Sequence, residues 1–229
     1  SEMAAYRAIT GDEPTASWPQ GVCIAREAFE SMGAATAFDL VEDRAIGGYP
    51  VAVKPAHGVS ASGVRRVDSV DQLGEAVSDA LSFDDAVIIE QWIDGVEVTV
   101  PVLGSGWDAY ALPPVEIVAK EGFCDTVACR TPGAVELFAP VRPASLSNDE
   151  ADAQAIRAEI ERAALEVCRA YQVRDLARVD LVWDGAQARV LEVDVSPSLA
   201  ESSPFSLACE ASGLSLSGVL NELVSQYAR

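Results

Sequence analysis

Positive charge and histidine are scarce in this chain of 229 residues. Sixteen lysines and arginines stand against 36 aspartates and glutamates, which gives a net charge of −20. Such an acidic chain repels nucleic-acid phosphates and anionic lipid headgroups, so we expect neither nucleic acid nor membrane as a partner. The two lysines, Lys54 and Lys120, are therefore informative about where an anion could bind. The single histidine, His57, is interpreted as a loop residue rather than a catalyst.

Cysteines and long apolar runs also exclude some classes of protein. The five cysteines are odd in number and include no CxxC pair, so neither a disulfide framework nor a zinc site is indicated. No apolar run approaches the roughly 18 residues that span a bilayer, and no secretory signal opens the chain. These features favour a reducing cytoplasm. At 49% hydrophobic residues, the chain can build one large domain or two small ones.

The most informative stretch covers residues 178–197. Two apolar runs flank the turn at 184–185, which predicts a β-hairpin. Asp180 lies on the first strand, and Glu192 and Asp194 lie two residues apart on the second, so these two share a face. The hairpin can bring Asp180 beside them.

Three carboxylates on one face repel one another unless a cation lies among them. Mg²⁺ and Mn²⁺ prefer oxygen ligands and share them with substrate phosphates, which makes them the natural candidates. The alternative is a solvated acidic edge, since aspartate and glutamate are mostly exposed.

A second candidate site follows the β-prone run that ends at Lys54. Glycines and serines at Gly58, Ser60, Ser62 and Gly63 form a strand–loop–strand segment. Glycines let backbone N–H groups approach phosphate oxygens, and serines add hydroxyl donors. The segment lacks a Walker A pattern, and taken alone it could be an ordinary turn.

Two carboxylates, Glu90 and Glu97, flank an apolar connection between two predicted strands. Such a place can hold an adenine, with one carboxylate near its amino group and the other near the ribose hydroxyls. The alternative is that both are edge carboxylates of an acidic protein. Elsewhere, periodicity and turn residues predict helices over 26–32, 36–45, 69–82, 148–171, 204–212 and 215–227, and strands over 109–118 and 134–139.

In this order the motifs resemble the ATP-grasp ligases, most closely the D-alanine–D-alanine ligase family. The resemblance runs from about residue 4 to the end. It implies an α+β ATP-grasp fold, with a central subdomain at 1–90, a C-terminal subdomain at 91–229 and no N-terminal substrate domain. The motifs that carry it are Val51-Ala-Val-Lys54-Pro55, the segment 58–63, Ile88–Glu97, Arg178-Val-Asp180, Glu192–Pro197 and the tail from Ser202.

The resemblance also implies roles for individual residues. Asp180, Glu192 and Asp194 would hold two Mg²⁺ (or Mn²⁺) ions on ATP. Arg178, Ser198 and Ser203 would act on the reacting groups. The residues implied to bind ATP are Lys54, Gly58, Ser60, Ser62, Gly63, Glu90, Trp92, Ile93 and Glu97.

The implied reaction activates a carboxylate as an acyl phosphate, which an amine then attacks to give an amide, ADP and phosphate. The resemblance implies amino-acid-like substrates, a role in peptidoglycan synthesis for the cell wall, and compatibility with a homodimer. Three positions depart from the family pattern: Cys129 replaces a loop lysine, Asp194 an asparagine and Ser198 a glycine. The alternatives are another dipeptide or natural-product amide ligase, or a non-catalytic nucleotide-binding module.

Overall fold

The computed structural model describes residues 16–31, 48–57, 63–120, 122–123, 128 and 131–227. The helix predicted over 36–45 and the candidate residues Gly58, Ser60, Ser62 and Cys129 lie outside these described residues. Contacts divide the chain into two compact units. Unit 2 comprises residues 19–93 and 119–136, and unit 1 comprises the remainder. The α+β class with mostly antiparallel sheets is confirmed.

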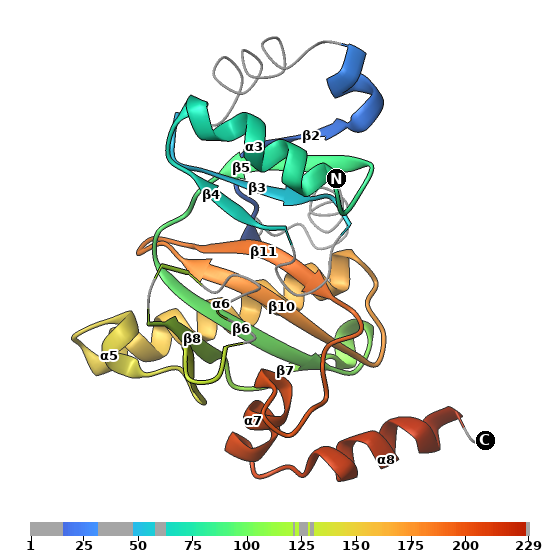
Figure 1. The fold of residues 1–229 in the computed structure, drawn as a ribbon. Coiled ribbons are helices and arrows are strands. Elements are labelled where there is room, and N and C mark those ends of the chain that lie inside the picture. Colours follow the sequence, from blue (N-terminus) through green and yellow to red (C-terminus); the bar gives the residue numbers. More distant parts are fainter. Residues whose placement is uncertain are drawn as a thin grey trace. The chain divides into compact units, whose positions relative to one another are not determined.

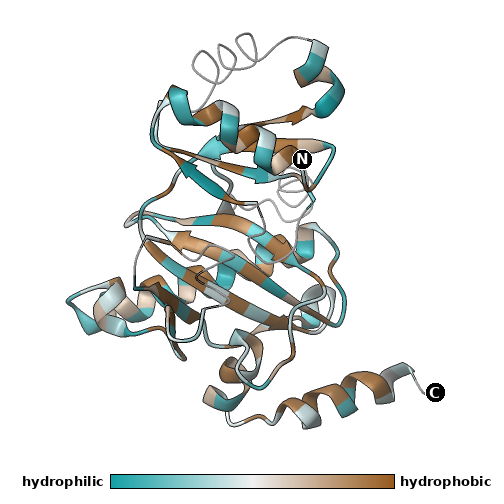
Figure 2. Ribbon diagram, in the orientation of Figure 1, coloured by the Kyte–Doolittle hydropathy of each residue, from teal (hydrophilic) through white to brown (hydrophobic). Residues whose placement is uncertain are grey.

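Unit 2 is built on a four-stranded antiparallel sheet in the order β2-β5-β3-β4 (Figure 1). Helix α3 packs Leu73, Val77 and Ala80 against the apolar side chains of this sheet. Figure 2 shows α3 banded in brown and teal, as expected for a helix with one buried face. The elements are β2 (Gly21–Ala25), β3 (Val51–Pro55), β4 (Arg65–Val67), α3 (Val70–Leu81) and β5 (Ala86–Gln91), and residues 26–31 are helical.

Unit 1 is built on a seven-stranded sheet in the order β1-β11-β10-β6-β8-β9, with β7 paired to β6. Its central pairs, β6 with β10 and β10 with β11, are antiparallel, and β1 joins β11 in parallel. The strands are β1 (Ala16–Ser17), β6 (Val96–Leu103), β7 (Tyr110–Ala111), β8 (Val115–Ala119), β9 (Val135–Phe138), β10 (Leu176–Trp183) and β11 (Ala188–Asp194).

Helix α6 (Glu150–Ala170) covers one face of this sheet and lies behind it in Figure 1. Its start is capped by Asp149, whose carboxylate accepts hydrogen bonds from the first-turn amides. Ile160 and Val167 are fully buried in the core that α6 forms with β6 and β10. Tyr171, the last residue of the helix predicted over 148–171, lies one residue beyond the end of α6 and is 44% exposed.

The strand predicted over 109–118 is wrong in its middle. The structure has the short β7 and then β8, separated by Leu112 and the pair Pro113-Pro114. Proline has no N–H to donate to a neighbouring strand, so the ladder stops there.

Two helices close the described chain. α7 (Pro204–Ala211) buries Phe205 and Cys209 in a separate apolar cluster, which also includes Val219 of α8 (Leu216–Tyr227). Arg142 begins the short helix α5 (Pro143–Leu146), and η1 (Gly106–Asp108) is a single 3₁₀ turn. Among the helices of the described residues, none has the length and apolar character that crossing a membrane would require.

Candidate functional site

The predicted hairpin is present in unit 1. Strands β10 and β11 are joined by residues 184–187, and the Asp184 carboxylate accepts hydrogen bonds from the amides of Ala186 and Gln187. Arg189 pairs with the same carboxylate at 2.8 Å. The loop is therefore held by its own first side chain, as expected of aspartate in a turn.

A β-bulge decides which way the acidic side chains of β11 point. The register pairs Leu181 with Val190 but Asp180 with Glu192, so Leu191 is the extra residue. Val190 lies in the core with α6, and strict alternation would direct Glu192 and Asp194 to that same face. The bulge shifts the alternation by one residue. Glu192 then pairs directly with Asp180, on the face opposite α6.

Arg178 provides the cation on this face. It pairs with Asp194 across the strands, and its Nη2 lies 3.0 Å from Oδ2 of Asp180 and 3.5 Å from Oδ2 of Asp194. Thr99 on β6 donates a hydrogen bond of 2.6 Å to Oδ1 of Asp180. Among the described residues, the buried Nε of Arg178 has no hydrogen-bond acceptor.

Burial and mutual charge shift the pKa values of this group. Burial raises the pKa of Asp180 above its usual value, although Arg178 and Thr99 oppose the rise. Burial disfavours the Arg178 cation, but Asp180, Asp194 and Glu192 outweigh it and raise its pKa.

Glu97 also lies on this face, two residues along β6 from Thr99. Burial, reinforced by the negative charge of Asp180, raises the pKa of Glu97 to about 7.

The carboxylates suit a divalent ion by donor type and by their shared face. Asp180, Glu192 and Asp194 lie on one sheet face, and their carboxylate oxygens are the ligand type that Mg²⁺ prefers. Even so, no three His, Cys, Asp or Glu side chains of the described residues are gathered as ligands of one ion. Arg178 takes the place beside Asp180 and Asp194, so the metal assignment stays a prediction.

Unit 2 carries most of the residues predicted to bind the nucleotide, with Glu97 of unit 1 as the exception. Lys54 on β3 and Glu90 on β5 form a close ion pair, with Nζ 2.6 Å from Oε1. Burial raises the pKa of Glu90, and the Lys54 charge partly offsets that rise. Gly21 of β2 pairs with Glu90, and a Cβ atom on it would lie only 2.7 Å from Cβ of Glu90. Gly21 therefore lets the backbone of β2 approach Glu90 more closely than any residue with a side chain could.

The segment after β5 is lined by aromatic and cationic groups. The Arg66 guanidinium lies 5.1 Å from the centre of the Trp92 ring, and Phe123 meets the same ring edge-on at 4.9 Å. Trp92 donates its backbone N–H to the carbonyl of Pro50, and Ile93 is half-buried. Gly63, the last of the glycines and serines predicted to bind ATP, has a positive φ of 78°.

The two predicted serines differ in surroundings. Ser198 is exposed, and its hydroxyl accepts a hydrogen bond of 3.4 Å from the amide of Ala200. Ser203 is 6% exposed and is the N-cap of α7, where its Oγ accepts from the amide of Ser206 at 3.2 Å. A structural role for Ser203 is therefore visible, while its role toward a substrate stays a prediction.

Thr99 was missed by sequence reasoning, although its spacing of two from Glu97 could have placed it on the same face.

Comparison with known proteins identifies the family. The family described as "D-ala D-ala ligase C-terminus" matches residues 23–225. The chain belongs to the D-Ala–D-Ala ligase family. It is 35% identical over 178 residues to a D-alanine–D-alanine ligase of Alcanivorax borkumensis, covering 77% of this chain and 54% of that protein. It is 34% identical over 202 residues to the corresponding ligase of Bordetella petrii, covering 88% and 59%. The chain thus spans little more than half the length of these relatives.

Solved structures support the ATP-grasp fold of this D-Ala–D-Ala ligase family member. The VanG D-Ala:D-Ser ligase of Enterococcus faecalis is 25% identical with a TM-score of 0.75, covering 97% of this chain and 59% of that one. A D-alanine–D-alanine ligase of Bacillus anthracis in complex with ATP has a TM-score of 0.68 at 21% identity, covering 97% and 63%.

Proposed function

We propose that this chain is the ATP-binding part of a ligase that joins two amino-acid-like substrates through an acyl phosphate, as a D-alanine–D-alanine ligase does. The observation that carries the proposal is the single sheet face on which Arg178, Asp180, Glu192 and Asp194 lie together. In a member of this ligase family, that face offers both an anion-binding cation and oxygen ligands for magnesium.

The proposed roles fall on residues of both units, and each unit is taken by itself. On unit 2, Lys54 would contact the α- and β-phosphates, while Glu90 and the Ile93 backbone would take the adenine edge, next to Trp92. The segment containing Gly58, Ser60, Ser62 and Gly63 would cover the β- and γ-phosphates. On unit 1, Asp180, Glu192 and Asp194 would hold Mg²⁺, whose charge stabilises the transferring phosphoryl group.

Three further residues of unit 1 complete the proposed machinery. Glu97 would accept hydrogen bonds from the ribose hydroxyls. Arg178 would stabilise the negatively charged intermediate, and its buried Nε, which has no acceptor among the described residues, supports an anionic occupant. Ser198 and Ser203 would position the second substrate.

The proposed reaction has two steps. The substrate carboxylate attacks the γ-phosphorus of ATP, the bond to the β-bridging oxygen breaks, and ADP leaves. The amine of the second substrate then attacks the acyl phosphate, loses a proton and expels inorganic phosphate, which leaves an amide.

The test has two stages. Calorimetry of this chain with a non-hydrolysable ATP analogue, first with Mg²⁺ and then with EDTA, should show binding that depends on the metal. The full-length protein, incubated with D-alanine and ATP, should release ADP and form D-alanyl-D-alanine. Absence of analogue binding in both conditions would refute the proposal for this chain.

A second candidate is a ligase for a different second substrate. The likeness to the VanG D-Ala:D-Ser ligase favours it, because that structure has a TM-score of 0.75, against 0.68 for the Bacillus anthracis ligase with ATP. Adding D-serine beside D-alanine in the full-length assay, with product analysis by mass spectrometry, separates the two candidates. ATP binding without any amide product would instead support a nucleotide-binding module.

We also propose a homodimer, which light scattering of the full-length protein would test.

A further inference from the structure

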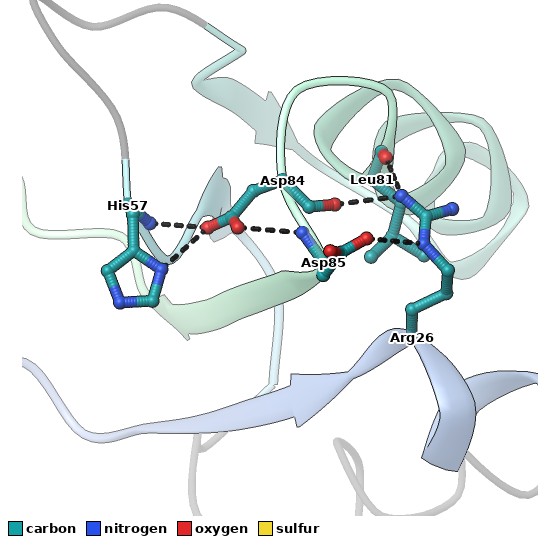
Figure 3. Close-up of polar contacts among 5 residues, drawn as sticks. All are labelled: Arg26, His57, Leu81, Asp84 and Asp85. Atoms are coloured by element: carbon teal, nitrogen blue, oxygen red, sulfur yellow. Dashed lines mark hydrogen bonds and ion pairs between the residues drawn. The ribbon is translucent and has the colours of Figure 1, made fainter.

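Three arginines lie among the described residues of unit 2, and the first of them, Arg26, holds the fold together. It binds the turn between α3 and β5 (Figure 3). Its Nη2 donates to the carbonyls of Leu81 and Asp84, and its Nε lies 3.0 Å from the Asp85 carboxylate. Arg26 thus ties the end of β2 to that turn.

The second arginine, Arg65 on β4, is structural in the same way. Its Nη1 pairs with the carboxylates of Glu75 and Asp79 on α3. The next residue on the strand is Arg66. Because side chains alternate along a strand, Arg66 points to the opposite face of the sheet, away from α3.

The face that Arg66 shares also carries residues predicted to bind the nucleotide. In the register, Arg66 lies opposite Ala52, and Ala52 lies opposite Glu90. Lys54 follows Ala52 by two residues on β3, and its Nζ lies 2.6 Å from Oε1 of Glu90. Arg66, Lys54 and Glu90 therefore lie on one face, while the apolar core that α3 completes lies on the other.

On this face the Arg66 guanidinium lies over the ring of Trp92. Its Cζ is 5.1 Å from the ring centre, within the range of a cation–π contact. Asp68 holds the guanidinium through Nε at 2.9 Å. The ring of Phe123 lies 4.9 Å from the Trp92 ring at an angle of 71°. The Trp92 ring is thus contacted by a cation and by a second aromatic ring, which limits its rotation.

The backbone of Trp92 is fixed as well. Its N–H donates a hydrogen bond of 3.2 Å to the carbonyl of Pro50. Trp92 lies between Glu90 and Ile93 in the chain, the two residues proposed to take the adenine edge. Since ordering a side chain on binding costs affinity, a ring that is already held favours the binding of a base beside it.

We propose that Arg66 is a positioning residue for the nucleotide: its guanidinium fixes the Trp92 ring next to the adenine. The inference rests on the proposed function, in which Glu90 and the Ile93 backbone take the adenine edge. Arg66 acts through the ring, so it contributes to binding of the base and not to binding of the outer phosphates.

The experiment compares two ligands that share the base and differ in phosphates. Calorimetry measures the Kd of a non-hydrolysable Mg·ATP analogue and, by displacement, the Kd of AMP. The proteins are wild type, Arg66→Gln, Arg66→Lys and the control Arg65→Gln, each checked for folding by circular dichroism. The control makes the same substitution on the same strand, at a side chain that points to α3.

We expect Arg66→Gln to raise the Kd of both ligands by the same factor, about fivefold, which is the size of a cation–π contact at a partly exposed site. Arg66→Lys keeps the cation, so its Kd values should stay within about twofold of wild type. Arg65→Gln should match wild type for both ligands.

A double-mutant cycle tests whether Arg66 acts through Trp92. In a Trp92→Leu background the ring is gone, so adding Arg66→Gln should change the Kd of the ATP analogue by less than about twofold. A further fivefold loss in that background would show that Arg66 acts on the nucleotide by another route and would overturn the inference.

Three other results would overturn the inference alone. They are wild-type affinity of Arg66→Gln for both ligands, a loss confined to the ATP analogue, and an equal loss in Arg65→Gln. The second would assign the guanidinium to the outer phosphates, and the third would indicate general loosening of the sheet. Failure of wild type to bind the analogue would overturn the proposed function and the inference with it, so the two failures are distinguishable.

Discussion

Glu97 is a carboxyl group whose protonation couples the stability of the fold to pH. Burial and the charge of Asp180 raise its pKa to about 7, against 4.5 for the ordinary group. Between these values the folded chain binds a proton that the unfolded chain has released. The free energy of unfolding therefore falls as pH rises through this window, by roughly 3 kcal/mol at most.

Replacing Glu97 with glutamine should remove this loss. In urea titrations at pH 5, 6, 7 and 8, the stability of Glu97→Gln relative to wild type should increase with pH and level off above about pH 7. Glu210→Gln, at an exposed position on α7, is the control and should show no such trend. A difference between Glu97→Gln and wild type that is the same at every pH would contradict the raised pKa.

The paired carboxylates Asp180 and Glu192 lead to a prediction about metal. The double variant Asp180→Asn with Glu192→Gln should lose the Mg²⁺-dependent part of ATP-analogue binding, by about tenfold or more, because two oxygen anions are neutralised. Calorimetry with and without EDTA measures that part. The matched control, Asp152→Asn with Glu210→Gln, neutralises one aspartate and one glutamate at exposed helix positions of the same unit. Unchanged metal dependence in the first variant would remove these residues from the metal site.

Among the elements, strand β11 shows how one extra residue decides chemistry. Deleting Leu191 would remove the bulge and still leave Glu192 opposite Asp180, because Val190 would then be followed directly by Glu192. Deleting Val193 would instead bring Asp194 opposite Val179, which lies in the core that packs on α6. Burying an unpaired carboxylate there costs several kcal/mol.

We therefore expect the Val193 deletion to unfold unit 1 or to lower its urea midpoint sharply, as followed by circular dichroism. Val193→Ala keeps the residue count and the register, so it should cause only a modest loss. A Val193 deletion variant with wild-type stability and wild-type Mg·ATP binding would show that the register does not matter.

Most of the elements were predictable because they depend on local pattern. Helix α6 and the hairpin of β10 and β11 follow from the periodicity and turn residues of their own segments. The prediction of one strand over 109–118 was wrong because it relied on the apolar residues of the segment and gave too little weight to Pro113 and Pro114. The bulge at Leu191 was not predictable, since it depends on the register against a second strand.

For the whole molecule, the net charge of −20 sets the response to salt. Repulsion among like charges destabilises the folded chain and is screened as ionic strength rises. We expect the melting temperature to increase between about 10 and about 300 mM NaCl, at constant pH.

A charge variant provides the control for this prediction. Glu201→Lys with Glu210→Lys replaces two exposed acids of unit 1 and should reduce the rise in melting temperature. An equal or larger rise in this variant would show that the salt effect does not come from net charge.

The sequence by itself determined which chemical groups are available and how they are spaced. The carboxylates at 180, 192 and 194, the lysine at the end of β3 and the family resemblance all follow from residue types in order along the chain. Only the tertiary structure decided which groups meet. It placed Arg178 as the cation beside Asp180, joined Lys54 to Glu90, and gave the hydroxyl of Ser203 to the start of α7. The physical reason is that a side chain's partners depend on register and burial, which are set by contacts between segments far apart in the sequence.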